Sequence, residues 1–210
     1  MFQNRIDAGK KLAKKLSEYG GCDVVVLAIP RGGVIVGFEV AKELNAPLDI
    51  VIPRKIGAPN NPELAIGAVT QDGTVMLNSE VVLFLGVQEE YIEDEKRKQI
   101  KEIERRMKKY RGDAVYPKLE GKIVILVDDG LATGATTRAA IASIRRQKPS
   151  MLILAIPVGP RDTIDGLKRE VDKIVFLSTP EPFYAIGQFY LNFEQTTDDE
   201  VVNILRIART

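Results

Sequence analysis

Residues 123–137 have the sequence IVILVDDGLATGATT, and this stretch indicates the fold class. Its first part, Ile123–Val127, is an unbroken apolar run, which is typical of a strand buried on both faces of a parallel sheet. Asp128 and Asp129 follow directly, and a turn rich in Gly, Ala and Thr then leads into a helix that begins near Gly134. Because ligands bind outside the carboxyl ends of parallel strands, the two acids and the turn are predicted to form a binding site.

Apolar runs of strand length recur on both sides of this stretch. They occupy residues 24–29, 48–52, 151–156 and 173–177. Segments with helical spacing of apolar residues accompany them, at residues 5–18, 34–44 and 163–171. The tail, residues 197–208, opens on Thr197-Asp198, which favours a helix N-cap. This alternation predicts an α/β fold with an open, mainly parallel sheet flanked by helices.

The stretch from residue 54 to residue 118 departs from the alternation. Residues 64–70 and 74–78 flank Gln71-Asp72-Gly73, which favours a β-hairpin. Residues 88–111 are charged nearly throughout, as expected of a solvated helix that packs along one narrow apolar stripe. We therefore expect residues 1–210 to form one domain, in which residues 54–118 are an insertion with a flexible lid and a charged helix.

Composition excludes several classes of function. The 210 residues are 45% hydrophobic and 28% charged, as in ordinary globular proteins, and the net charge of +1 argues against a nucleic-acid partner. Histidine is absent, which excludes Ser-His triads and histidine metal sites. Cys22 is the single cysteine, and no apolar run reaches signal-peptide length or the roughly 18 residues of a membrane span. We expect a cytoplasmic protein without a membrane partner.

The turn after the acids has the chemistry of a phosphate site. Small residues, threonine hydroxyls and a helix N-terminus together provide donors for an anion. Two adjacent carboxylates would repel a phosphate unless a ribose diol, with Mg²⁺ nearby, lay between them. A P-loop is excluded because Ala135 follows Gly134, and a Rossmann fingerprint because the acids precede the glycines. The apolar run with two acids resembles a Walker B strand, but no Walker A loop accompanies it. The remaining alternative is a surface turn with a helix cap.

The segment ILVDDGLATGATTRAA, residues 125–140, resembles the 5-phosphoribosyl-1-pyrophosphate motif of the type I phosphoribosyltransferases. The chain as a whole is similar to a branch of that family with unassigned substrate. The resemblance implies that Asp128 and Asp129 are catalytic residues that hold the ribose hydroxyls, and we expect both to face solvent in the ligand-free protein. It further implies a 5′-phosphate site made of Thr133, Gly134, Ala135, Thr136 and Thr137.

Two further segments match places where the family binds pyrophosphate. Pro30-Arg31-Gly32-Gly33 follows the first apolar run, where glycines would admit the diphosphate and Arg31 would clamp it. Arg54 and Lys55 follow the second run and would add cations for the leaving group. An ordinary strand-to-helix turn and a random surface pair are the respective alternatives.

Two other segments have weaker assignments. Residues 57–70 occupy the place of the family's mobile loop and are expected to be a lid, with Glu63 as a candidate proton shuttle. Residues 180–190 concentrate aromatic side chains, and Phe183 and Tyr184 are expected to line the base pocket. Aromatic packing in the core is an equal alternative for that segment.

The resemblance implies transfer of a phosphoribosyl group from the pyrophosphate donor to a purine or pyrimidine base, with Mg²⁺ as cofactor. No metal ligand is assigned, although Asp128 and Asp129 are candidates. Ala132 stands where the hypoxanthine-guanine branch carries an acid, which hints at the adenine branch. The alternative is a non-catalytic regulator that senses the donor, since fold does not fix function. A diphosphotransferase would need an ATP site, which we do not find. The acceptor base, the general base and the oligomeric state, a homodimer included, stay open.

Overall fold

The computed structural model describes residues 1–209, with the backbone but not the side chain of Glu63. Its main sheet has five parallel strands in the order β2-β1-β6-β7-β8. They are β1 (Val24–Ala28), β2 (Leu48–Ile50), β6 (Ile123–Val127), β7 (Met151–Val158) and β8 (Lys173–Ser178). Each coincides with or overlaps a run predicted to be a strand, so the α/β fold with a mainly parallel sheet is confirmed.

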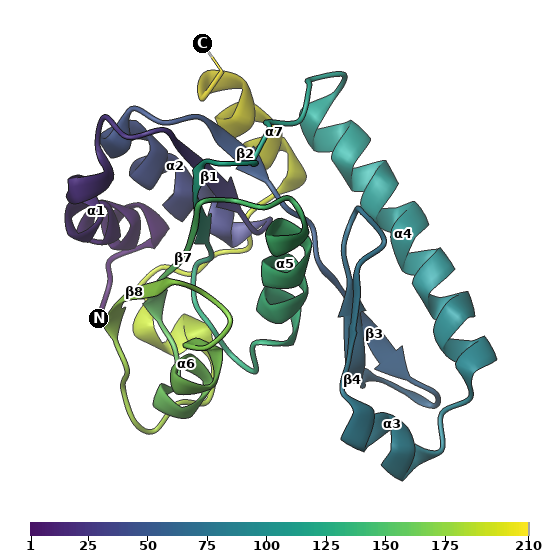
Figure 1. The fold of residues 1–210 in the computed structure, drawn as a ribbon. Coiled ribbons are helices and arrows are strands. Elements are labelled where there is room, and N and C mark those ends of the chain that lie inside the picture. The colour runs from purple at the N-terminus through teal and green to yellow at the C-terminus, as the bar shows by residue number, and fades with distance from the viewer. Residues whose placement is uncertain (210) are drawn as a thin grey trace.

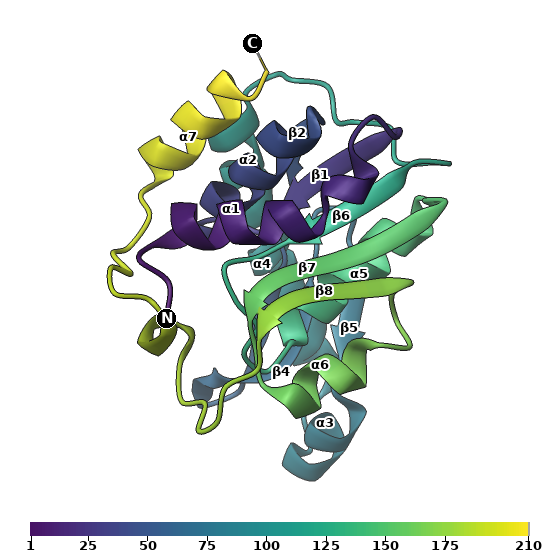
Figure 2. The same ribbon diagram turned by 90° about the vertical axis from the view of Figure 1, so that its left-hand side faces the viewer.

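Helices cover both faces of this sheet (Figure 1 and Figure 2). On one face lie α1 (Arg5–Lys15) and α2 (Gly32–Leu44), with the closing helix α7 (Asp198–Ile207) packed against α2. On the other lie α5 (Ala135–Arg146) and α6 (Arg161–Leu167). Short 3-10 turns occupy Ser17–Tyr19 and Ile186–Phe189. No helix in the described part of the chain is long and apolar enough to cross a membrane.

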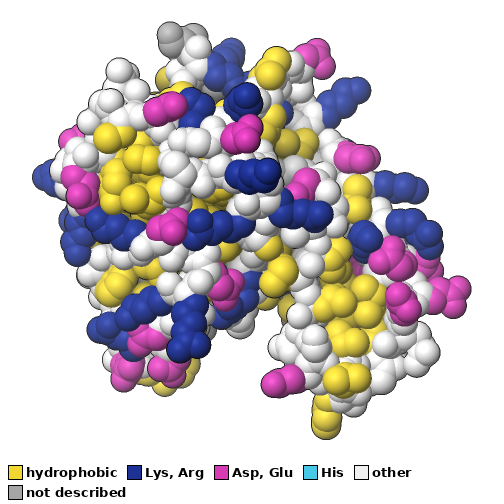
Figure 3. All heavy atoms as spheres, in the orientation of Figure 1, with side chains coloured by type: hydrophobic (Ala, Val, Ile, Leu, Met, Phe, Trp, Pro, Cys, Tyr) yellow, Lys and Arg dark blue, Asp and Glu magenta, His cyan; other side chains and the backbone are white. Residues whose placement is uncertain are grey.

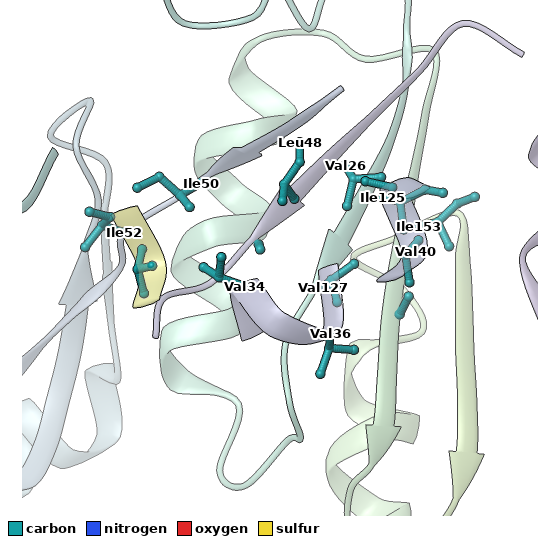
Figure 4. Packing of buried hydrophobic residues seen from close by; sticks show 14 of the residues in the cluster. Val26, Val34, Val36, Val40, Leu48, Ile50, Ile52, Ile125, Val127 and Ile153 are labelled. Atoms are coloured by element: carbon teal, nitrogen blue, oxygen red, sulfur yellow. The ribbon is translucent and has the colours of Figure 1, made fainter. Parts of the chain in front are cut away.

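Strand side chains alternate between two hydrophobic clusters. Val26 and Ile125 pack toward α2, in one cluster with Val40 of that helix (Figure 4). Their neighbours Val25 and Leu126 pack toward α5 and α6. Each fully buried aliphatic side chain stabilises the fold by about 1.5–3 kcal/mol. Burial on both faces explains why these strands are continuous apolar runs rather than alternating ones.

The segment between β2 and β6 forms a separate antiparallel sheet, β3-β4-β5. Its elements are β3 (Arg54–Ala58), β4 (Asn61–Val69), β5 (Val75–Leu77), α3 (Ser79–Leu85) and α4 (Glu89–Arg111). The predicted hairpin around residues 71–73 is confirmed by the pairing of β4 with β5. Figure 3 shows a hollow between this insertion and the main body at the bottom of the view.

The segment at residues 57–70, which we expect to be a lid, is not an irregular loop, and its role as a lid stays a prediction. This segment is mostly the β3–β4 hairpin, closed by Pro59 and Asn60, with Asn60 in the left-handed region at φ 65°. Ile56 and Ile66 are fully buried, so the hairpin has a packed face. The glycines and prolines that suggested an irregular loop instead belong to a tight turn and an irregular ladder.

Helix α4 confirms the narrow-stripe interpretation. Only Ile92, Ile103 and Tyr110 of its described side chains are buried. Ion pairs at i,i+3 and i,i+4 spacing cover the other faces, among them those of Glu102 with Arg105 and Arg106. Hydrogen bonds from these two arginines lower the pKa of Glu102 to about 2.

Candidate active site

Parallel register brings two predicted loops together at the carboxyl edge of the main sheet. Ala28, the last residue of β1, pairs with Val127, the last residue of β6. The glycine turn after β1 therefore lies against the acids after β6. A β-carbon placed on Gly33 would be only 3.0 Å from the Cα and Oδ1 atoms of Asp128. This close contact favours glycine at position 33, because a β-carbon there would require the Asp128 loop to shift slightly.

The acid pair is more buried than the sequence suggested. Asp128 is partly buried, and Asp129 is only 9% exposed. The backbone N–H of Asp129 donates to Asp128 Oδ1 at 2.8 Å, and Arg5 Nε donates to Asp129 Oδ2 at 2.7 Å. The expectation that both carboxylates face solvent is thus wrong for Asp129. A guanidinium from 124 positions away covers it, which local sequence does not show.

Burial also sets the protonation behaviour of the pair. It raises the pKa of Asp128 well above its ordinary value, and the neighbouring Asp129 carboxylate raises it further. It raises the pKa of Asp129 as well, and Arg5 opposes that rise. The pair therefore resists carrying two full charges in the ligand-free protein, and a cation or hydroxyl donors would favour the ionised form.

The predicted phosphate turn forms the N-terminus of α5. Gly134 is the N-cap residue with φ 80° and ψ −1°, a backbone conformation that favours glycine. Among the described side chains none caps this helix end, although Thr133, Thr136 and Thr137 lie within one turn of it. A helix start without a side-chain cap leaves backbone N–H groups for an anion. The five residues at 133–137 are therefore brought together with the expected donors.

Arg31 lies at the start of α2, beside the glycine turn, but its side chain is engaged elsewhere. Its Nη1 atom is 3.6 Å from Asp198 Oδ1 at the start of α7. The same Asp198 carboxylate accepts hydrogen bonds from Lys109 Nζ at 2.8 Å and from Tyr110 Oη at 2.6 Å. A cavity of about 350 Å³ beside Arg31 is lined by two cations, Arg31 and Lys109, and by two acids, Asp198 and Asp199.

Arg54 and Lys55 have different surroundings. Arg54 Nε donates to Gln99 Oε1 of α4 at 2.8 Å, so its guanidinium contacts the charged helix rather than the acid pair. The role of Arg54 as a cation for the leaving pyrophosphate stays a prediction. Consecutive strand residues point to opposite faces, so Lys55 lies on the face of the hairpin away from Arg54. The side chain of Glu63 lies outside the described residues.

The aromatic segment at residues 180–190 lies over the acid loop. A β-carbon on Gly130 would be 2.5 Å from Cγ2 of Ile186, so this segment packs directly on the loop. Phe183 packs on Phe189 with ring centroids 4.9 Å apart, as the core-packing alternative supposed. Tyr184 is 84% exposed and does not line an enclosed pocket in this conformation.

Two residues at the site were missed by sequence reasoning. Arg5 looked like one more cation on an amphipathic helix, and only tertiary structure shows its partner. Tyr190 donates its hydroxyl to the carbonyl oxygen of Asp129 at 2.6 Å. A buried tyrosine hydroxyl usually needs a partner, so the aromatic segment carried a weak signal for it.

The acids suit a cation that arrives with a ligand. No group of three or more His, Cys, Asp or Glu residues in the described part of the chain could hold a metal ion. Asp128 and Asp129 alone offer two carboxylates, one of them already paired with Arg5. Mg²⁺ is often held by one or two carboxylates together with substrate phosphates, and the residues present fit that arrangement.

Comparison with known proteins agrees with this geometry. The phosphoribosyl transferase domain model matches residues 2–194. The chain is 45% identical over 205 residues to a Mycobacterium tuberculosis protein named "Putative phosphoribosyl transferase Rv0571c". That match covers 98% of the chain and 46% of the relative, so the chain spans about half the length of the curated relatives it matches.

Solved structures show the same fold. The protein TT1426 from Thermus thermophilus is 38% identical, with a TM-score of 0.84 and coverage of 98% of this chain and 97% of that one. A Neisseria gonorrhoeae protein solved with bound ppGpp has a TM-score of 0.50 at 14% identity, covering 100% of this chain and 99% of that one. The second likeness concerns the fold alone. The family model and the identity to these relatives establish that the chain belongs to the phosphoribosyl transferase domain family.

Proposed function

We propose that this protein transfers a phosphoribosyl group from 5-phosphoribosyl-1-pyrophosphate to a nitrogenous base and releases pyrophosphate. One observation carries the proposal: the Gly32-Gly33 turn, the acid pair and the N-terminus of α5 meet at one edge of the parallel sheet. The glycine turn offers donors for a diphosphate, and the acid pair offers acceptors for the ribose hydroxyls. The N-terminus of α5 offers donors for a 5′-phosphate. The family assignment supports the same chemistry.

In the proposed reaction a ring nitrogen of the base bonds to the ribose anomeric carbon as the bond to pyrophosphate breaks. The base loses a proton, and pyrophosphate leaves with the bonding electrons. Positive charge builds on the ribose ring, close to Asp128 and Asp129, while negative charge builds on the leaving group. The residues act mainly by positioning and by preorganised electrostatics.

Several cations could stabilise the departing diphosphate. Arg31 adjoins the glycine turn, but it must leave Asp198 to reach a ligand. Lys109 borders the same cavity and is a further candidate. Arg54 and Lys55 are further candidates from the insertion, and Arg54 would have to turn away from Gln99 to reach a ligand. When bound with the donor, Mg²⁺ would neutralise further charge there, with Asp128 and Asp129 as its protein ligands.

The acceptor is proposed to be a purine or pyrimidine held under the segment at residues 180–190. Ile186 lies over Gly130, so a base beside the ribose would meet this segment first. Tyr184 would have to turn inward to stack on the base, because it is exposed here. Glu63 stays a proposed proton shuttle because it belongs to the segment that we expect to be a lid.

The proposal is tested by incubating the protein with the donor, Mg²⁺ and a panel of purine and pyrimidine bases. Pyrophosphate release that depends on one base supports transfer, and the Asp128→Asn/Asp129→Asn double variant is the matched control. Donor binding without release for any base would favour the regulator alternative. Failure to bind the donor at all would overturn the assignment.

Residues 1–210 are proposed to act as one domain. The hydrophobic cluster around Val26 and Ile125 of the main sheet continues to Ile56, Ile66 and Ile103 of the insertion. A shared core favours a single cooperative unit.

A homodimer is also proposed. Leu83 and Phe84 of α3 are 80% and 88% exposed, and Figure 3 shows hydrophobic side chains gathered on the lower part of the insertion. Light scattering of the protein and of a Phe84→Glu variant tests this. A monomeric wild-type protein would contradict it.

A further inference from the structure

Arg5, in the first turn of α1, reaches the acid pair through a buried side chain that is 11% exposed. Its Nε atom lies 2.7 Å from Asp129 Oδ2, and its Nη1 atom donates to the carbonyl oxygen of Glu194 at 2.8 Å. The guanidinium carbon is 3.8 Å from the centroid of the Phe193 ring. The C-terminal segment thus fixes Arg5 from two directions, and Arg5 in turn fixes Asp129.

The ion pair lies directly beneath the glycine turn. A β-carbon added to Gly32 would collide with Asp129 Oδ2 and lie 2.6 Å from Arg5 Nε. The three residues therefore form one close contact between the proposed pyrophosphate turn and the acids. Oδ2 of Asp129 therefore has little room to move, because Arg5 Nε and the Gly32 backbone both lie against it.

The pairing also determines which oxygen of Asp129 meets a ligand. Oδ2 accepts from Arg5, so Oδ1 is left for a ligand hydroxyl. Like charges on adjacent carboxylates repel each other strongly where water is excluded. The guanidinium of Arg5, within hydrogen-bond distance, offsets this repulsion and holds the Asp129 carboxylate in one orientation.

We propose that Arg5 is a positioning residue for the ribose hydroxyls, acting through Asp129. This proposal rests on the proposed function and adds the N-terminal helix to a site otherwise built from the loops after β1 and β6. Arg5 does not touch the ribose. Its role is to hold Asp129 Oδ1 where a hydroxyl can donate to it.

Calorimetry with ribose 5-phosphate and 2-deoxyribose 5-phosphate isolates this role. The wild-type protein should prefer ribose 5-phosphate by about tenfold or more, as expected when a hydrogen bond to a charged group is lost. In Arg5→Met the preference should fall below about threefold. Without Arg5 the Asp129 carboxylate is no longer held in place, so its hydrogen bond with the ribose hydroxyl is weaker. Affinity for inorganic phosphate should stay within about twofold, because the α5 turn is a separate set of contacts.

Two further variants make the outcome decisive. Lys10→Met removes one exposed charge from the same helix and should leave the preference unchanged. Arg5→Lys keeps the buried charge, so it should fold even if Arg5→Met does not. It should still lose part of the preference, because lysine lacks the planar fork that meets Asp129, Glu194 and Phe193 together. Full preference in Arg5→Lys, or in a folded Arg5→Met protein, would overturn the proposal.

The experiment distinguishes failure of the proposed function from failure of the role of Arg5. If the wild-type protein shows no preference for ribose over 2-deoxyribose, then the acids do not bind the hydroxyls and the proposed function loses support. If the wild-type protein discriminates and the Arg5 variants discriminate equally well, only the role of Arg5 is wrong.

Discussion

Arg111, the last residue of α4, makes two hydrogen bonds to Asp49 of β2. Arg111 Nε lies 2.7 Å from Oδ1, and Nη2 lies 2.8 Å from Oδ2, with the two side chains 8% and 7% exposed. The guanidinium also lies over the ring of Tyr116, 4.9 Å from its centroid. This buried pair joins the end of the insertion to the edge of the main sheet. It therefore helps to hold the insertion in place relative to the site.

Arg111→Met should destabilise the protein by about 3–5 kcal/mol, because it leaves the buried Asp49 carboxylate without its partner. Arg97→Met is the matched control, since Arg97 belongs to the same helix and its side chain is 69% exposed. Urea unfolding of both variants measures the difference. Equal stabilities would show that the Arg111 pair does not anchor the insertion.

Gly32→Ala should abolish donor binding. The added methyl group would collide with Asp129 Oδ2 and displace the Arg5 ion pair, so the acids and the turn could not keep their contact. Gly166→Ala on α6 is the control, because its β-carbon would meet only the flexible end of Arg138. Calorimetry with the donor and Mg²⁺ compares the two, and normal binding by Gly32→Ala would contradict the placement of the turn.

Asp198 should stabilise the fold in a way that depends on pH. Hydrogen bonds from Lys109 and Tyr110 lower its pKa to about 2 from an ordinary value of 3.8. A lowered folded-state pKa gives stability that is fully present above about pH 4 and is lost as the pH falls toward 2. Asp198→Asn should therefore be less stable than wild type at pH 6, with a gap that narrows at pH 3. A difference in the free energy of unfolding that does not change with pH would contradict a stabilising role for the Asp198 carboxylate.

Hydrogen exchange tests whether the β3–β4 hairpin of the insertion closes over the site. The tip of the β3–β4 hairpin, residues 58–61, should exchange faster than β6 in the ligand-free protein, because it is a short turn at the end of an exposed ribbon. Donor and Mg²⁺ should slow that exchange if the hairpin closes over the site. Unchanged protection at the tip on addition of donor would remove the lid role and leave the phosphate turn unaffected.

The sequence predicted the parts of this protein that depend on local pattern. Buried strands such as Ile123–Val127 are visible as apolar runs, and Thr197 with Glu200 forms the expected N-terminal cap of α7. The turn at Gly134 is visible because its left-handed backbone conformation, with φ 80°, favours glycine. These features are set by neighbours along the chain.

What the sequence did not predict depends on distant partners. Arg5 meets Asp129 across 124 positions, and Tyr110 meets Asp198 across 88, so no local pattern marks either contact. The hydrogen bond of Arg54 to Gln99 of α4 is another tertiary contact that no local pattern marks. The pairing of β3 with β4 was not predicted either, because the register shifts around Gly57 hide the strand pattern there.

Calorimetry tests most directly whether the turn at Thr133–Thr137 binds a phosphate. Nucleoside monophosphates should bind far more tightly than the matching nucleosides, because helix N-terminal amides contribute direct hydrogen bonds to the anion. Gly134→Val should abolish the difference, since valine is strained at φ 80° and would press on Thr163. Nucleosides and nucleotides that bind the wild-type protein equally well would contradict the assignment of this turn.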